Sequence, residues 1–257
     1  MRHVSVIAVV LVTMGVAGQL SAEETAKSII DAAVDKNATG FQSGIGQLTL
    51  TTEDKGGDAK TRKLQVRSKR GDEGQRTMVK LLAPDEVKGQ GFLFKEVKDG
   101  EDLVYWYLPA FGVTRRISGE GKKGRFMGTH LTYADLESRD VRDGTYLRRP
   151  DEKIGAFEVY VVEATPAKGS DSDYSKVVMY VRKTDKMPLK VKFFDRAGKE
   201  DKVIFTEKID TQGDRTYVKQ MTVRPAAGGF TRLTVDAIDF ERSIPDVVFT
   251  PESLANE

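Results

Sequence analysis

The chain has 257 residues and no cysteine, and its 41 basic residues nearly balance 39 acidic ones. This composition excludes disulfide bonds and gives no indication of a nucleic-acid partner. The only histidines are His3 and His130, so a typical zinc or copper site cannot be assembled from Cys and His. Stability must come from a buried apolar core, which a chain of this length can form.

The first 22 residues have the three zones of a secretory signal. A short basic start precedes an apolar run over 4–16, and small residues end at Ala22. The apolar run is shorter than the roughly 20 residues that a membrane-spanning helix needs. We therefore expect cleavage near Ala22, and a single periplasmic domain over 23–257.

Periodicity predicts one helix followed by many strands. Apolar residues recur at helical spacing over 24–37, which indicates an amphipathic helix. Beyond it, alternation with a period of two and Gly- or Asp-rich turns indicate short strands. These strands are expected at 48–51, 64–68, 77–82, 92–97, 103–108, 113–117, 157–164, 176–182, 189–194, 202–209, 216–223 and 231–241. The pattern favours a mainly β, antiparallel barrel or sandwich over alternating β and α units.

One expected strand departs from the alternation. The segment 103–108 reads Leu-Val-Tyr-Trp-Tyr-Leu and is apolar on both faces. Such a strand is either covered on both sides or lines a pocket with one side. The residues alone leave both interpretations open.

Two segments have the spacing of known binding motifs, but the residues around or within them do not fit those motifs. The segment 119–124 matches G-x-G-x-x-G, but no long apolar helix follows it, so we interpret it as a basic loop. The segment 171–182 opens like a calcium loop, yet Lys176 and Arg182 stand where Gly and Glu are needed. His130 has no evident nucleophile beside it, so we interpret it as structural. We therefore expect no enzyme, no metal and no cofactor.

Apolar and basic residues concentrate between 107 and 136. Aliphatic and aromatic groups suit acyl chains, and Arg and Lys suit anionic heads or a membrane surface. An ordinary lid that fills the interior of the sheet is the other interpretation, and both stay open here.

Several segments resemble the outer-membrane lipoprotein-sorting-like proteins, in the superfamily of the periplasmic lipoprotein carrier and its outer-membrane receptor. They are Pro-Asp-Glu-Val-Lys-Gly-Gln-Gly-Phe-Leu at 84–93, Trp-Tyr-Leu-Pro at 106–109, Arg-Arg-Ile at 115–117, Phe-Met-Gly-Thr at 126–129 and Leu-Thr-Tyr-Ala-Asp-Leu at 131–136. The resemblance implies an open antiparallel half-barrel of about eleven strands with covering helices. It also implies a concave apolar interior that holds lipid acyl chains. His130 departs from the family pattern, in which we expect an acidic residue.

The leading hypothesis is a periplasmic carrier or chaperone that binds a lipoprotein acyl chain or another lipid without covalent chemistry. The resemblance also implies partners: an inner-membrane exporter of the resistance-nodulation-division type, an outer-membrane acceptor and transient membrane contact. The alternative is a ligand-free adaptor of such an exporter. The candidate ligand-binding residues are Leu50, Leu64, Val66, Val79, Leu81, Phe92, Phe94, Val104, Trp106, Leu108, Phe126, Met127 and Leu131. The candidates for an anionic head or membrane are Arg115, Arg116, Lys122, Lys123 and Arg125.

Overall fold

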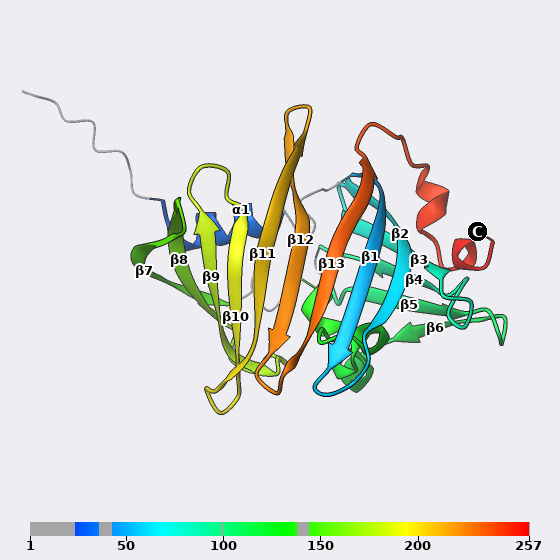
Figure 1. The fold of residues 1–257 in the computed structure, drawn as a ribbon, viewed down its shortest axis with the longest axis horizontal. Helices are drawn as coiled ribbons and strands as arrows, with labels where there is room; N and C mark the ends of the chain where they lie inside the picture. The colour runs from blue at the N-terminus through cyan, green and yellow to red at the C-terminus, as the bar shows by residue number, and fades with distance from the viewer. Residues whose placement is uncertain (1–23, 36–42, 99, 138–143, 257) are drawn as a thin grey trace, which may run out of the picture.

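A computed structural model describes residues 24–35, 43–98, 100–137 and 144–256 (Figure 1). The expected signal over 1–22 lies outside these residues. The predicted helix is present as α1 (Ala26–Asp35), and its last two predicted residues also lie outside the described part. No helix in the described ranges is long and apolar enough to cross a membrane.

The described residues form thirteen strands in a single antiparallel sheet (Figure 1). The strands of the first half are β1 (Gly44–Asp54), β2 (Lys60–Gly71), β3 (Gly74–Ala83), β4 (Gly91–Lys95), β5 (Leu103–Leu108) and β6 (Val113–Ile117). The strands of the second half are β7 (Thr145–Ile154), β8 (Phe157–Thr165), β9 (Tyr174–Arg182), β10 (Pro188–Asp195), β11 (Glu200–Gln212), β12 (Arg215–Pro225) and β13 (Gly229–Asp239). The predicted open antiparallel sheet is thus confirmed.

The strand order is β6-β5-β4-β3-β2-β1-β13-β12-β11-β10-β9-β8-β7. Each strand pairs with its neighbour in the chain, and β1 pairs with β13 in the middle of the sheet. The two edges are therefore β6 and β7, which are consecutive in the chain. The connection between them must cross from one edge to the other, and we name its described part, residues 118–137, the crossover segment. It contains three short 3-10 helices, η1 (Gly119–Lys123), η2 (Phe126–Gly128) and η3 (Ala134–Leu136).

The sequence analysis did not predict β7. Most of its side chains are exposed, and Pro150 and a run of charged residues interrupt any apolar alternation. A register shift between Arg149 and Glu152 marks the irregularity. An edge strand with one neighbour tolerates such residues, whereas a central strand does not.

Helix α1 packs on β7, β8 and β9 and buries Ile29, Ile30 and Ala33 against the sheet. These three residues are spaced so that they share one face of the helix. Their partners on the sheet include Val162, Val177, Met179, Val181 and Phe193. The helix therefore covers one side of the second half of the sheet, behind the strands in the view of Figure 1.

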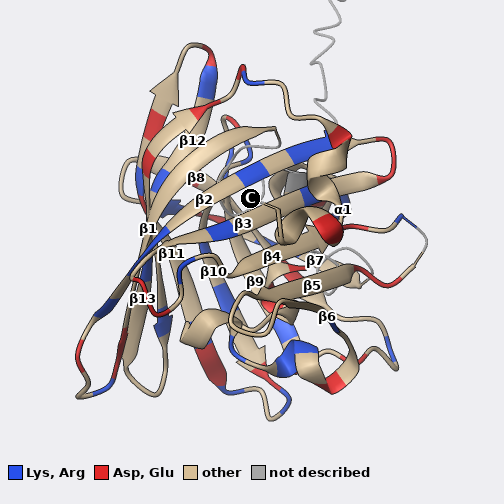
Figure 2. Ribbon diagram, turned by 90° about the vertical axis from the view of Figure 1, so that its right-hand side faces the viewer, with Lys and Arg blue, Asp and Glu red and all other residues tan. Residues whose placement is uncertain are grey.

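The C-terminal residues 244–256 cover the first half of the sheet from the opposite side. Their 3-10 helices η4 (Asp246–Phe249) and η5 (Glu252–Leu254) contact β3 and β4. Figure 2 shows the ribbon from that side, with Lys and Arg residues along β2 and β3 next to this segment. Lys69 donates to Asp246 at 2.7 Å, and Lys80 donates to the Leu254 carbonyl at 2.7 Å.

This cover answers the question about the strand at 103–108, which is β5. Tyr105 and Tyr107 pack against the buried Phe249 and Leu254 on the C-terminal side. Val104 and Trp106 point to the other side and pack in the main apolar cluster. Both faces of β5 are covered, and Val104 also lines a cavity.

Candidate functional site

The structure holds a cavity of about 380 Å³ between the sheet, α1 and the crossover segment. Strands β1 to β5 supply one wall, and strands β9 to β13 supply the other. Most of the lining is apolar. A volume of this size lies within the roughly 300–1,000 Å³ that small-molecule sites occupy.

The structure places seven of the thirteen candidate ligand-binding residues in the lining of this cavity. They are Leu64, Val66, Val79, Phe94, Val104, Phe126 and Leu131. Leu64, Val66, Val79, Phe94 and Val104 lie on β2 to β5, and Phe126 and Leu131 lie on the crossover segment. The five strand residues belong to one wall of the cavity.

The other six candidates do not line the cavity. Leu50, Leu81 and Phe92 are fully packed in the cluster beside it. Trp106 stacks on Phe92 with ring centroids 5.8 Å apart and donates to Gln90 at 3.2 Å, and Met127 packs on the same cluster. Leu108 is half-buried at the end of β5. Large side chains fill this end of the sheet, so these residues pack in or beside the apolar cluster instead of lining the cavity.

The opposite wall was missing from the candidate list. It is formed by residues of β9 to β13, with two residues of α1 beside them. These residues are Ala33, Val34, Met179, Val191, Phe193, Ile204, Val218, Met221 and Leu233. Alternation in 189–194 and 216–223 was visible in the sequence, but only the pairing of β1 with β13 shows that both halves face one space.

The crossover segment contributes to an aromatic cluster beside the cavity. The Phe126 ring lies 5.1 Å from Phe92, 5.8 Å from Phe94 and 5.6 Å from Tyr133, each edge to face. Burial raises the pKa of Tyr133 to about 12. Met127, which directly follows Phe126, has a φ of 50°, in the left-handed region that non-glycine residues rarely adopt. The chain therefore turns directly after Phe126, whose ring stays buried in the cluster.

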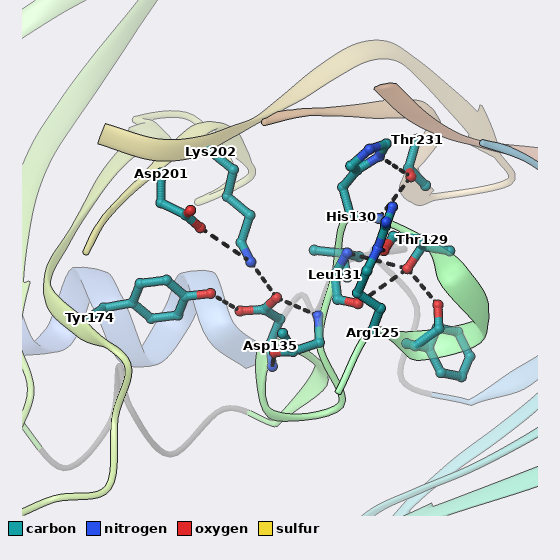
Figure 3. A network of polar contacts seen from close by, with 11 residues as sticks. Arg125, Thr129, His130, Leu131, Asp135, Tyr174, Asp201, Lys202 and Thr231 are labelled. Carbon is teal, nitrogen blue, oxygen red and sulfur yellow. Dashed lines mark hydrogen bonds and ion pairs between the residues drawn. The ribbon is translucent and has the colours of Figure 1, made fainter. Parts of the chain in front are cut away.

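A buried polar network fixes the far end of the crossover segment (Figure 3). Asp135 accepts hydrogen bonds from the Tyr174 hydroxyl, the Lys202 ammonium and the Thr132 backbone N–H, each at 2.6 Å. The Asp135 side chain is fully buried, and that of Lys202 is 5% exposed. Burial and the Asp135 carboxylate raise the pKa of Tyr174 well above its ordinary value. The network joins the crossover segment to β9 and β11.

The contacts of His130 also connect the crossover segment to the sheet. Its backbone N–H donates to the Thr231 hydroxyl at 3.0 Å, its Nδ1 lies 2.9 Å from the same oxygen, and its Nε2 lies 3.2 Å from Asp54. Burial and the nearby Arg125 guanidinium lower the pKa of His130, against the opposing effect of Asp54. These contacts tie the segment to β1 and β13.

None of the five candidate head-binding residues lies in the cavity lining among the described residues. Lys122 is buried and contacts Glu101 at 2.9 Å and Glu137 at 2.8 Å, so its charge is neutralised inside the protein. Lys123 pairs with Glu120 and Asp171, and Arg125 pairs with Asp54 at 2.8 Å.

The exposed pair Arg115 and Arg116 lies on edge strand β6. Arg116 lies 3.3 Å from Glu101. Among the residues that the structure describes, no three His, Asp or Glu side chains are grouped so that they could hold a metal ion.

A family model described as "Uncharacterized protein" matches residues 73–256. No curated protein matches the chain. Three solved structures share its fold over nearly their whole length. A domain assigned to the outer membrane lipoprotein-sorting proteins from Vibrio parahaemolyticus is 25% identical, with a TM-score of 0.81, and the alignment covers 90% of this chain and 100% of that one.

A DUF1329 family protein from Desulfovibrio piger is 26% identical, with a TM-score of 0.79 and coverage of 89% and 98%. A LolA superfamily protein from Nitrosomonas europaea is 22% identical, with a TM-score of 0.69 and coverage of 90% and 99%. The resemblance inferred from the motifs is thus confirmed. The chain belongs to the family that this model describes, and its fold is similar to those of the lipoprotein-sorting domain, the DUF1329 protein and the LolA superfamily protein.

Proposed function

We propose that the protein is a periplasmic carrier that holds a lipid or lipoprotein acyl chain in its cavity. The observation that supports this most directly is the apolar space between the two halves of the sheet, which residues of α1 and the crossover segment also line. The similar structure from Vibrio parahaemolyticus, a domain assigned to the outer membrane lipoprotein-sorting proteins, supports the same class of function. A ligand-free adaptor would be expected to have a filled interior.

Binding in this proposal depends on burial alone. Removing apolar surface from water contributes about 25 cal/mol per Å², so roughly 400 Å² of buried acyl surface gives about 10 kcal/mol before association costs. No bond is made or broken, and no enzymatic step is part of the proposal. Release would require the crossover segment to separate from β9, β11 and β13, so that the ligand exchanges this cavity for a membrane or an acceptor protein.

A cavity-filling variant tests the proposal. Val66→Trp places a large ring in the lining, and we expect the affinity for a fluorescent fatty-acid probe to fall on the order of tenfold or more. The matched control is Val247→Trp, because Val247 is exposed on the C-terminal segment. Circular dichroism and thermal unfolding of both variants verify that they fold, and Met221→Phe provides a second substitution in the opposite wall.

Two results would contradict the carrier. One is equal probe affinity in the wild type, Val66→Trp and Val247→Trp. The other is the recovery of no stoichiometric hydrophobic ligand, by native mass spectrometry with lipid extraction, from protein purified from its own cell envelope, together with no probe uptake. These results would favour the adaptor.

A further inference from the structure

The cavity wall formed by β2 and β3 changes from apolar to polar along one row of side chains. Four pairs face each other across these strands on the cavity side: Leu64 with Leu81, Val66 with Val79, Ser68 with Thr77, and Arg70 with Gln75. All of these residues except Leu81 line the cavity. Two aliphatic pairs are thus followed by a hydroxyl pair, and then by a guanidinium and an amide.

The hydroxyl pair lies where the apolar wall ends. The Ser68 and Thr77 oxygens are 2.9 Å apart, and Ser68 is buried. A hydroxyl offers one donor and two acceptor positions, so a bond between the two uses one donor and one acceptor. The second O–H and the remaining lone pairs can face a ligand in the cavity. A wall meant only for hydrocarbon would be expected to carry two more aliphatic residues here.

The charge of Arg70, beside this hydroxyl pair, is compensated by Glu96 within the protein. Arg70 lies 3.4 Å from Glu96, and the same Glu96 oxygen accepts the Gln75 backbone N–H at 2.8 Å. An anionic ligand would have to displace Glu96 to pair with Arg70. A neutral ligand with hydroxyl groups can hydrogen-bond here while the ion pair stays in place.

Among the described residues, the other basic side chains that line the cavity are Lys95 of β4 and Lys190 of β10, and neither belongs to the row of facing pairs on β2 and β3. Lys122, which the sequence analysis named for an anionic head, is neutralised by Glu101 and Glu137. Glu96 and Glu137 both line the cavity, so carboxylates stand on two sides of this end. Their presence disfavours an anion there.

We propose that the polar end of the cavity, formed by Ser68, Thr77, Arg70 and Gln75, binds the neutral, hydroxyl-bearing head of a single-chain amphiphile. This inference rests on the proposed carrier function and specifies its ligand. The tail lies along Val66, Val79 and Leu64, toward Phe126 of the crossover segment. The cavity volume, at the low end of the range for small-molecule sites, favours one chain.

Three probes separate the head from the tail. N-phenyl-1-naphthylamine reports apolar binding alone, 1-monoolein carries a neutral glycerol head, and oleate carries an anionic head on a tail of the same length. We expect the full chain to bind all three, with 1-monoolein at least tenfold tighter than oleate at pH 8. Displacement of the fluorescent probe measures the two lipid affinities.

The variant Thr77→Val removes one hydroxyl with little change in shape. We expect it to weaken 1-monoolein on the order of tenfold, the effect of losing one hydrogen bond, and to leave the naphthylamine probe unchanged. The matched control is Thr61→Val, because Thr61 pairs with Thr51 at 3.3 Å on the exposed side of the neighbouring strands. Ser68→Ala repeats the test from the other hydroxyl if Thr77→Val fails to fold.

The outcomes distinguish the head site from the carrier function. If the naphthylamine probe binds but oleate matches or exceeds 1-monoolein, or Thr77→Val and Ser68→Ala leave 1-monoolein unchanged, the head site is wrong and the carrier stands. If the wild type binds none of the three probes, the carrier itself fails, and the head site with it.

Discussion

The carboxylate of Asp135 and the ammonium of Lys202 lie 2.6 Å apart in a region from which solvent is almost excluded. Asp135 belongs to the crossover segment, and Lys202 belongs to β11 in the second half of the sheet. The pair therefore fastens the segment that joins the two sheet edges to a strand far from both ends of that segment. A separation of this segment from the sheet, as the proposed carrier function requires, must break this contact.

Substitution of Lys202 by Met tests this attachment. Removing one partner of a buried ion pair leaves the other charge without compensation, so we expect a loss of about 3–5 kcal/mol in the free energy of unfolding. The control is Lys192→Met, because Lys192 pairs with Glu200 at the surface, where such pairs contribute about 0–1 kcal/mol. Urea unfolding measures both. Equal losses in the two variants would mean that the Asp135 contact does not hold the segment.

Stability should depend on pH through His130. Burial and Arg125 lower the pKa of this histidine, so the folded protein favours the neutral ring. Its contribution is present above the unfolded pKa of about 6.5 and is lost as the pH falls through the lower, folded pKa. We therefore expect the wild type to lose stability relative to His130→Gln between pH 7.5 and pH 5. An NMR titration of the His130 ring with an inflection above 6.5 would contradict this.

The C-terminal cover should be important for stability but not for ligand binding. Leu254 is fully buried against the outer side of the sheet, away from the cavity. Replacing it with Ala removes buried methyl groups and leaves a void, so we expect a loss of about 2–5 kcal/mol. Val247→Ala serves as a control, because Val247 is 68% exposed. Thermal unfolding and probe binding, measured together, check both statements. Weaker probe binding by folded Leu254→Ala would show that the two faces are coupled.

Among the residues of the crossover segment, Phe126 should give the largest loss in the free energy of unfolding when its side chain is truncated. Its ring contacts three other aromatic rings and lines the cavity. Phe126→Ala is expected to lower the free energy of unfolding by about 3–5 kcal/mol. Phe111→Ala, at a residue 73% exposed, should change it by less than about 0.5 kcal/mol. Denaturant unfolding compares the two, and similar values would place the crossover segment outside the cooperative core.

Local patterns were sufficient to predict most of the sheet. Alternation along β2, β3 and β4 put residues such as Val66, Val79 and Phe94 on the cavity side, and the structure has them there. The strand β7 could not be found in this way, because an exposed edge strand with Pro150 lacks the alternation on which the prediction depends. Alternation of apolar and polar residues predicts a strand only where one face of that strand is buried.

Of the thirteen residues expected to bind the ligand, seven line the cavity and six do not. Whether an inward side chain lines a space or fills it depends on the size of side chains from distant strands, as Phe92 and Trp106 illustrate by stacking on each other. The role of Lys122 was hidden for a similar reason, since Glu101 and Glu137 approach it only in the folded chain. Composition marks this loop as basic but does not reveal which charges are neutralised.

The pairing of β1 with β13 has a consequence for how the chain acquires its structure. Ile45 lies beside Asp239, so the central seam joins residues from nearly opposite ends of the sequence. All other strand pairs form between neighbours along the chain and can zip up as each hairpin emerges. The seam must wait for the final strand, so the two walls of the cavity come together only after both halves of the sheet have been synthesised.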